Sequence, residues 1–335
     1  MKKRMLFLLI GLIIFNSCSQ LKSGELINNS PLRFEVKSFF ETTPIISAND
    51  AADDICVWAP DNPLQPIFVV GTDKKRGLET YDEKGRRVFD KDFGRVNNVD
   101  LWNSPIGPVI VGSNRSHNSI DFYKLNSKNG SLKLLSRYKT DLDDVYGITV
   151  YNKDEEVSVF ISDKKGTILQ YKIELIDQFI SVMLTDTHSF SSTVEGIKGD
   201  SFYQRLYVAE EDKGLWIIDL KSDKFERNKV YKTDKKNLIP DLEGMALLDL
   251  GSGEGYLFLS VQGNNSYAIF DRKTLKLVAI FQITKDNLIG GVEETDGIEI
   301  VNQDNFSYFI AQDGINEGHQ NFKFVKLDEI ISKIR

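Results

Sequence analysis

Short apolar runs separated by polar turns fill the chain from about residue 33 onward, and most of them have the length of a β-strand. The runs are rich in β-branched and aromatic residues, whereas Gly, Asn and Asp gather between them. Helical periodicity is absent until Leu327–Arg335, which we expect to form a short capping helix. The pattern predicts an all-β fold.

Two local patterns alternate six times in this region. One is an acidic or polar tag that opens an apolar strand, and the other is a pair of strands joined by a short polar loop. The third residues of successive tags lie 44 to 53 residues apart, and the tags are Asp53-Asp54-Ile55, Asn97-Asn98-Val99, Val145-Tyr146-Gly147, Val194-Glu195-Gly196, Leu242-Glu243-Gly244 and Thr295-Asp296-Gly297. Six repeats of about four short strands are typical of a β-propeller, so we expect six four-stranded antiparallel blades. The N-terminal strand expected at Arg33–Phe40 lies outside these repeats, and we expect it to join the last blade and close the ring.

A propeller topology places both patterns on one face of the molecule. In a four-stranded meander the first strand begins at the end to which the loop between strands two and three returns, and the first strand is the innermost one. The tags should therefore ring the central axis, with the polar loops just outside them. Acidic residues dominate the tags, and the loops of the first three blades carry Lys74, Lys75, Arg115, Lys164 and Lys165.

A ring of carboxylates with basic residues around it indicates a metal ion and an anion. Two unit charges 4 Å apart repel each other by roughly 1 kcal/mol in water and by about 4 kcal/mol at an effective dielectric constant of 20, so crowded carboxylates need cations. Oxygen ligands in irregular number suit calcium better than zinc or copper. The Lys and Arg side chains suit an anion that the metal also binds, and phosphate meets both requirements.

The known covalent nucleophiles of phosphatases are missing from their usual contexts. Cys56 does not open a Cys-x5-Arg loop, none of the three histidines lies in an Arg-His-Gly sequence, and Asp-x-Asp-Gly-Thr is absent. Cys56 instead lies in an apolar run, where we expect a packed and unreactive thiol. These absences favour a water molecule activated by bridging metal ions over a phospho-enzyme.

Composition and charge exclude several other classes of protein. The 335 residues are 41% hydrophobic and 27% charged, as in a folded globular protein, and the formal net charge of −7 argues against nucleic-acid binding. Two cysteines are too few for a disulfide scaffold, and three scattered histidines argue against a zinc site. We expect a monomer with no nucleic-acid partner.

The first residues have the features of an export signal. Three basic residues at 2–4 precede an apolar run over 5–15, which is shorter than the roughly 20 residues that a membrane-spanning helix needs. Cys18 follows in a position that resembles the lipobox of bacterial lipoproteins. We therefore expect an exported protein that is lipid-anchored through Cys18 at the bacterial cell envelope (periplasmic or surface), or that is otherwise secreted. The expected segments are a signal peptide (1–18), a tether (19–32) and a single propeller domain (33–335).

Ten short runs occur in a fixed order between about residue 34 and the C-terminus. The runs are Asp50–Asp54, Asn97–Asp100, Ser113–Ser116, Val145–Gly147, Tyr207–Asp212, Asp241–Gly244, Gln262–Ile269, Phe281–Thr284, Thr295–Ile298, and Ala311–Gly314 followed by Asn321–Lys323. In residue content, order and spacing, they resemble the β-propeller phytases.

The resemblance implies a six-bladed propeller that hydrolyses phytate (myo-inositol hexakisphosphate) with several calcium ions, and calcium–phytate is the expected substrate form. Matched by motif, the residues that would hold the phosphate being cleaved are Lys74, Arg115, Tyr146 and Lys164, and Lys75 would hold a neighbouring phosphate. The residues that would hold the active-site calcium ions are Asp53, Glu195, Glu211, Asp241, Glu243, Gln262 and Asp296. A structural calcium nearer the axis would lie on Asp54 and the carbonyl oxygen of Val99.

Three departures from the family pattern bear on these expectations. They are Lys165 in place of a glutamate, Ile55-Cys56 in place of Pro-Ala, and Gly290 and Ile315 at the acidic positions of a peripheral calcium site. We expect a changed metal occupancy or pH optimum, and a weakened or lost peripheral site. Two other functions fit the same architecture: a non-catalytic calcium-binding propeller that binds a ligand or partner, and a calcium-dependent propeller lactonase or esterase. A lactonase has no use for three basic loops.

Overall fold

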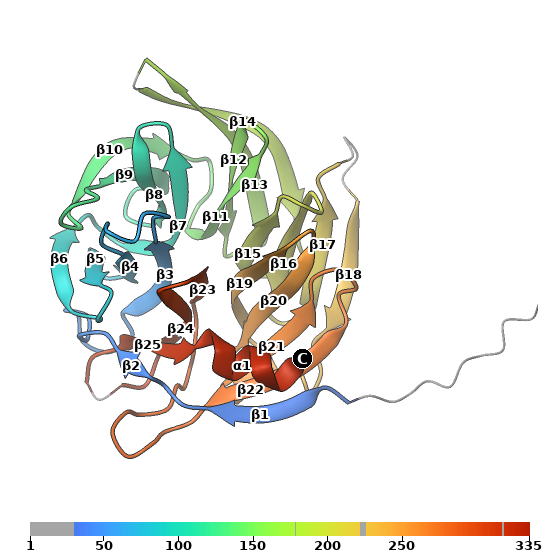
Figure 1. Ribbon diagram of the computed structural model, residues 1–335. Coiled ribbons are helices and arrows are strands. Elements are labelled where there is room, and N and C mark those ends of the chain that lie inside the picture. Colours follow the sequence, from blue (N-terminus) through green and yellow to red (C-terminus); the bar gives the residue numbers. More distant parts are fainter. Residues whose placement is uncertain (1–29, 178, 222–225, 317) are drawn as a thin grey trace, which may run out of the picture. The chain divides into compact units, whose positions relative to one another are not determined.

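The strands form six sheets arranged around a central axis, and four of the sheets follow chain order from the inside outward (Figure 1). This computed structural model describes residues 30–177, 179–221, 226–316 and 318–335. The predicted six-bladed β-propeller is confirmed. The predicted signal peptide, Cys18 and nearly all of the predicted tether lie outside the described residues.

Blades 1 to 4 each consist of four consecutive antiparallel strands. Blade 1 contains β3 (Ala52–Trp58), β4 (Phe68–Asp73), β5 (Gly77–Asp82) and β6 (Arg87–Asp92), and blade 2 contains β7 (Val96–Ser104), β8 (Gly107–Asn114), β9 (Ser119–Leu125) and β10 (Leu132–Lys139). Blade 3 contains β11 (Val145–Lys153), β12 (Glu156–Asp163), β13 (Thr167–Ile176) and β14 (Phe179–Ser189), and blade 4 contains β15 (Val194–Asp200), β16 (Arg205–Glu210), β17 (Gly214–Asp219) and β18 (Arg227–Lys232).

Blades 5 and 6 combine strands from the two ends of the chain. Blade 5 contains β19 (Leu242–Gly251), β20 (Glu254–Val261), β21 (Ser266–Asp271) and β22 (Leu277–Ile283), with β1 (Leu32–Val36) added in parallel to β22. Blade 6 contains β23 (Ile298–Gln303), β24 (Phe306–Asp313) and β25 (Asn321–Lys326), and β2 (Phe40–Glu41) pairs antiparallel with β25.

Ring closure therefore differs in detail from the prediction. The segment Arg33–Phe40 is not one strand of the last blade, because most of it forms β1 on blade 5 and only its end reaches blade 6 as part of β2. The predicted C-terminal helix is present as α1 (Leu327–Ile334), and it packs Leu327, Ile330 and Ile331 into the core between blades 5 and 6. No helix among the described residues is long and apolar enough to cross a membrane.

The hydrophobic core is divided into six clusters, one between each pair of neighbouring blades. The cluster between blades 6 and 1, which includes Phe322 and Val69, completes the circle. Cys56 is fully buried in the cluster between blades 1 and 2, so the expectation of a packed thiol is confirmed. Each blade buries apolar side chains on both of its faces, and this explains why the inner strands read as nearly continuous hydrophobic runs.

A β-bulge recurs near the start of the first strand in five blades. The pairing with the second strand is interrupted between Ala52 and Ile55, Val96 and Val99, Val145 and Ile148, Val194 and Ile197, and Leu242 and Met245. The interrupted positions are the tag residues. Because a bulge frees residues from the ladder and re-aims their side chains, the tags leave the regular pleat at the point where each strand starts.

Close packing around the axis explains the glycines of the tags. A Cβ atom on Gly147 would lie 1.8 Å from the carbonyl oxygen of Glu195, and one on Gly196 would lie 2.1 Å from that of Glu243. In each case the tag backbone of the following blade passes directly over the glycine. The acid-glycine pairs of the sequence are therefore a packing requirement as well as a source of carboxylates.

Candidate functional site

The first strands of the blades form a closed ring in which β3, β7, β11, β15, β19 and β23 are successive neighbours. This ring brings together tags that lie far apart in the sequence. The loops between the second and third strands follow outside the ring, and Lys74 of one such loop contacts Asp53 in its own blade and Asp296 in blade 6. The tags and loops therefore share one face, as the topology predicts.

A polar pocket of about 280 Å³ opens among these tags and loops. The residues that line it come from five blades and the preceding loops: Asp50, Lys74, Tyr146, Glu211, Asp241, Glu243, Gln262, Glu294, Asp296 and Gln320. Seven of the ten are residues to which the sequence assigned a role in phosphate or metal binding. Asp50, Glu294 and Gln320 were not assigned one.

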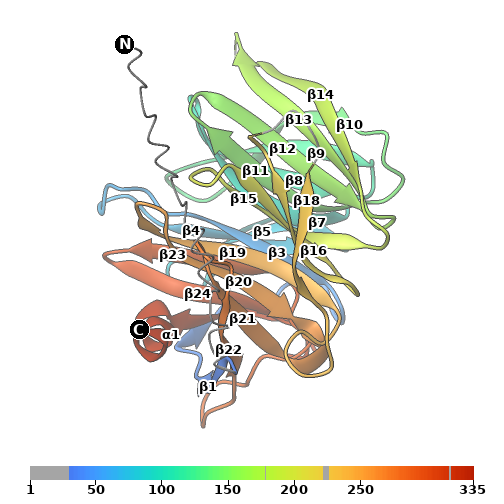
Figure 2. The ribbon, with the colours of Figure 1, turned by 90° about the vertical axis from the view of Figure 1, so that its right-hand side faces the viewer.

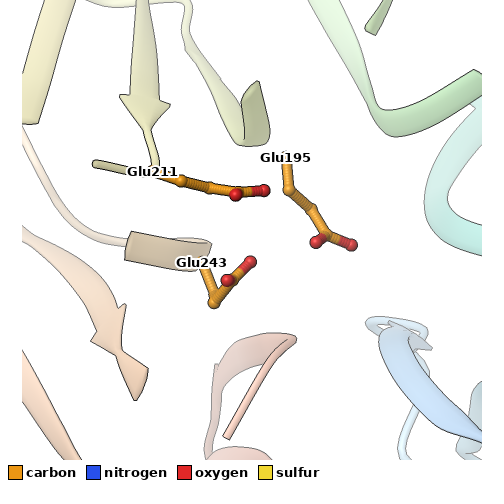
Figure 3. Close-up of side chains that lie close together, drawn as sticks. All are labelled: Glu195, Glu211 and Glu243. Atoms are coloured by element: carbon orange, nitrogen blue, oxygen red, sulfur yellow. The ribbon is translucent and has the colours of Figure 1, made fainter. Parts of the chain in front are cut away.

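Three glutamates from neighbouring blades converge at one side of this pocket. Each of Glu195, Glu211 and Glu243 offers a carboxylate oxygen within 4.8 Å of the others, and their side chains point toward a common space (Figure 3). Glu195 and Glu243 are 3% and 5% exposed. The three come from the first strands of blades 4 and 5 and from the β16–β17 loop.

The electrostatics of this cluster are unfavourable for the chain alone. Burial and then the carboxylate of Asp241 raise the pKa of Glu211 to about 7. Burial, with the charges of Glu195 and Asp296, raises the pKa of Glu243 well above its usual range. Oε2 of Glu243 is buried without a hydrogen-bond partner among the described residues. A buried carboxylate oxygen without a protein partner, among neighbouring acids with raised pKa values, fits a bound metal ion, and a purely oxygen donor set favours a hard cation.

Asn97 links the carboxylates of opposite blades, a role that the motif comparison did not assign to it. Its side-chain Nδ2 lies 2.7 Å from Oδ2 of Asp53 and 3.0 Å from Oε1 of Glu195, and the residue is fully buried. The amide therefore orients two predicted metal ligands at once. Its position inside the second tag was the only sequence signal for this role.

Lys74 lies deep among carboxylates on the other side of the pocket. Its ammonium nitrogen lies 2.7 Å from Asp50, 2.8 Å from Asp53 and 3.8 Å from Asp296. Burial alone would lower the pKa of Lys74, but the charges of Asp53 and Asp296 raise it, so the side chain stays protonated. Lys74 is the counter-ion that the chain itself provides to this group of acids.

Arg115 is held by its neighbours in a fixed orientation. Nε and Nη2 donate to the two carboxylate oxygens of Asp144 at 2.9 and 2.8 Å, and Nη1 donates to Oδ1 of Asn97 at 3.2 Å. The guanidinium also lies 5.8 Å from the ring centre of Tyr146. Asp144 directly precedes the tag Val145-Tyr146-Gly147, but its pairing with the fork of Arg115 was not predicted.

Tyr146 and Lys164 form a second contact pair at the edge of the pocket. The ammonium nitrogen of Lys164 lies 4.5 Å from the ring centre of Tyr146, and Lys164 is otherwise exposed. Burial and then the charge of Glu195 raise the pKa of Tyr146, so its hydroxyl remains protonated. Lys75 points elsewhere, because its ammonium donates to the carbonyl oxygen of Ala48 at 2.7 Å.

The residues predicted to hold a structural calcium are brought together beside the axis. The backbone N–H of Val99 donates to Oδ2 of Asp54 at 3.0 Å, and both residues line a narrow cavity that also contains Lys198. Burial raises the pKa of Asp54 to about 8.

Gln262 belongs to the polar pocket and not to this narrow cavity. Its amide Nε2 donates to Oδ1 of Asp296 at 2.6 Å.

The positions that depart from the family pattern lie at the edges of this arrangement. Lys165 is exposed and forms an ion pair with the exposed Asp143. A Cβ atom at Gly290 would lie 3.0 Å from the ammonium nitrogen of Lys323, which already pairs with Asp313 at 2.6 Å. Ile315 is 55% exposed. An ammonium group therefore stands beside position 290.

Comparison with known proteins agrees with this geometry. The chain matches the phytase family over residues 2–335. It is 32% identical to a 3-phytase of Bacillus subtilis (strain 168) over 330 residues, which cover 90% of this chain and 86% of the relative. With a match over nearly its whole length, a six-bladed propeller and a pocket that combines carboxylates with Lys, Arg and Tyr, the chain belongs to the phytase family.

Proposed function

We propose that this protein is a phytase that hydrolyses phosphomonoesters of phytate, that calcium is its metal, and that water attacks phosphorus without a phospho-enzyme. The proposal rests on one observation: the same pocket contains both carboxylates and the side chains of basic and hydroxyl-bearing residues. Glu211, Glu243 and Asp296 provide carboxylate oxygens, and Lys74 and Tyr146 provide donors, with the ammonium of Lys74 3.8 Å from Asp296. A phosphate bound between a metal ion and basic side chains needs both groups.

The metal would be held by the crowded carboxylates of the pocket and its surroundings, and Lys74 provides a counter-charge to two of them, Asp53 and Asp296. We assign the active-site ions to Asp53, Glu195, Glu211, Asp241, Glu243, Gln262 and Asp296, and a structural ion to Asp54 with the carbonyl oxygen of Val99. Calcium suits them because all of the donors are oxygen atoms from carboxylate, amide or backbone groups. The chemistry that calcium supplies when bound is activation of water and neutralisation of charge on the phosphate.

The basic residues orient the phosphate and stabilise its equatorial oxygens as the bond to the leaving oxygen breaks. Arg115 is pre-oriented by Asp144 and Asn97, so little side-chain freedom is lost when it meets an anion. Lys164 is held against the ring of Tyr146, whose protonated hydroxyl donates a hydrogen bond and adds no negative charge. We assign the neighbouring phosphate to the exposed Lys75.

The pocket offers no residue of the kinds that form a phosphoryl intermediate through sulfur, hydroxymethyl or imidazole groups. Its described lining contains no Cys, Ser, Thr or His side chain. The thiol of Cys56 is buried in the core between blades 1 and 2, away from the pocket. These observations favour direct attack by water. The acidic lining also favours calcium–phytate as the substrate form, because free phytate is itself strongly anionic.

Release of inorganic phosphate from phytate, measured with calcium and after its removal by EDTA, tests this proposal. We expect phosphate release that needs calcium and that falls by at least tenfold in Glu243→Gln. Binding of calcium–phytate without any phosphate release would instead identify a ligand-binding propeller. Hydrolysis of a lactone or carboxylic ester in place of phytate would identify a lactonase or esterase.

We also propose that the protein is exported and anchored through an acylated Cys18. The support is the basic and apolar sequence that precedes this cysteine. Cys18→Ala should move the protein from the membrane fraction to the soluble fraction and leave its specific activity unchanged. A wild-type protein that is already fully soluble would show that no lipid anchor is attached.

A further inference from the structure

The outermost strand of blade 3 has an unusual free edge. An unpaired strand edge can pair with another chain, and soluble proteins protect such edges with charged side chains, above all lysine, or cover them. In this protein β1 covers β22 and β2 covers β25. β1 and β2 thereby become the outer strands of blades 5 and 6, and the outer strands of blades 1 to 4 are β6, β10, β14 and β18.

Three of these four strands carry the expected charges. The charged residues are Arg87, Asp90, Lys91 and Asp92 on β6, Lys133, Arg137 and Lys139 on β10, and Arg227, Lys229 and Lys232 on β18. β14 is the longest of the four, with 11 residues, yet it contains no lysine or arginine and a single carboxylate, Asp186. It therefore lacks the protection that the other edges have.

The edge of β14 also exposes large apolar side chains. Phe179 is 78% exposed, Met183 57% and Leu184 45%. Ile180 and Val182 lie on the opposite face of the strand from Phe179 and Met183. On that face they pack partly against the core cluster between blades 2 and 3. At the end of the strand, the carbonyl oxygen of Ser189 accepts a hydrogen bond from Arg227, so the free part of the edge runs over 179–186.

The β13–β14 hairpin extends beyond the rest of its blade. β12 pairs with β13 only as far as Ile173, whereas β14 continues along β13 to Ile176. Figures 1 and 2 both show this hairpin projecting past the neighbouring blades. The apolar edge is therefore accessible along its length to another molecule.

We propose that this edge is a self-association surface, where β14 of one chain pairs antiparallel with β14 of a second copy. A twofold axis at Val182 would place Leu184 opposite Ile180 and Met183 opposite Ser181. Asp186 would lie outside the paired segment Phe179–Thr185, so no like charges would face each other. Such pairing satisfies the free backbone groups of both edges and buries apolar side chains of both copies.

The neighbouring residues favour a second copy over a membrane or a charged partner. Glu174 and Asp177 lie at the exposed tip of the hairpin, where their carboxylates oppose insertion into a bilayer. A strongly charged partner would find only one charged side chain on β14. The sequence-based expectation of a monomer did not include this edge, because the sequence alone does not show which strands remain uncovered.

Sedimentation velocity over a range of micromolar concentrations tests the proposal. We expect the weight-average mass to rise toward twice that of the monomer, and Met183→Lys to abolish the rise without changing the melting temperature. Leu135→Lys is the matched control, because Leu135 is a 40% exposed apolar residue on the charged outer strand β10. This control variant should associate as the wild type does.

A cysteine placed on the twofold axis tests the register of pairing. In a Cys18→Ala background, Val182→Cys should form an intermolecular disulfide on mild oxidation, since the other thiol, Cys56, is fully buried. Val88→Cys on β6 should not. A wild-type mass that stays monomeric throughout, or equal loss of association in the lysine variants of β14 and β10, would overturn the proposal. Binding to phosphatidylcholine vesicles that Met183→Lys abolishes, with no self-association, would assign the edge to a membrane instead.

Discussion

The ammonium nitrogen of Lys198 lies 3.6 Å from a carboxylate oxygen of Asp100, and this contact crosses the central axis from blade 4 to blade 2. The same nitrogen lies 3.5 Å from Oε2 of Glu299 in blade 6. All three residues lie one or two positions beyond the tags on their strands. Lys198 thus supplies a permanent positive charge on the axis, next to the carboxylates that we assign to metal binding.

Lys198→Met should destabilise the metal-free protein by about 3–5 kcal/mol, because the carboxylates of Asp100 and Glu299 would remain buried without a cation. Calcium should stabilise this variant more than it stabilises the wild type, since the freed oxygen atoms can accept a metal ion. The free energy of unfolding in urea, with EDTA and with calcium, measures both effects. Lys172→Met is the control, because Lys172 pairs with the exposed carboxylates of Glu156 and Glu174, and it should change stability little.

The blade number and the face that bears the site could be predicted because both follow from local patterns. The recurring tags set the period, and the meander fixes the end of the blade at which Lys74 and Glu243 lie. The partners of these side chains could not be predicted, because they come from other blades. Asn97 between Asp53 and Glu195 is one such case.

The closing strands show the same limit of sequence reasoning. The pattern at Arg33–Phe40 indicates a strand, but an apolar strand carries no information on whether it will pair with β22 or β25. The choice depends on the path of the chain across the outside of two blades. The exposed edge of β14 could not be predicted for a related reason. The sequence of a strand does not show whether another strand covers its outer edge.

Stability without calcium should fall as the pH rises. The folded-state pKa values of Asp54, about 8, and Glu211, about 7, lie above the values of about 4 in unfolded chains, so these residues favour the folded state when they are protonated. Their contribution is complete below about pH 4 and is lost as the pH rises through 7 to 8. In EDTA, the melting temperature should therefore be higher at pH 5 than at pH 9.

Calcium should act in the opposite sense, because it binds the ionised carboxylates. Binding to the native state alone stabilises a protein by about 2.7 kcal/mol at a hundredfold excess over Kd. The difference in melting temperature between calcium and EDTA should grow from pH 5 to pH 9. Equal melting temperatures in calcium and EDTA at pH 9 would contradict a metal role for the carboxylate ring.

Asn97→Ala should weaken calcium binding, although Asn97 is not itself assigned as a ligand. Its amide orients Asp53 and Glu195, and loss of such a positioning group typically lowers metal affinity 10- to 100-fold. The calcium concentration that gives half of the maximal activity, and calcium binding measured by titration calorimetry, should both shift by this factor. Asn103→Ala, at an exposed position on the same strand, should change neither.

The two roles assigned to the basic residues can be separated by Arg115→Ala and Lys75→Ala. Arg115 is held next to the pocket by Asp144 and Asn97, and the phosphate that it contacts gains charge on its equatorial oxygens in the transition state. Its loss should therefore lower kcat and kcat/KM together. Lys75 points away from this group, and if it holds only a neighbouring phosphate, its loss should raise KM with little change in kcat.

A substrate with one phosphate makes the separation sharper. Such a substrate places nothing at the second position, so Lys75→Ala should hydrolyse it almost as well as the wild type does, whereas Arg115→Ala should be impaired on it as strongly as on phytate. Lys165→Ala is a useful comparison, since Lys165 is also exposed but pairs with Asp143. Equal loss of activity in all three variants on both substrates would contradict these two roles. The basic loops would then attract anions by a general electrostatic field, because only a non-specific field treats the two substrates and the three positions alike.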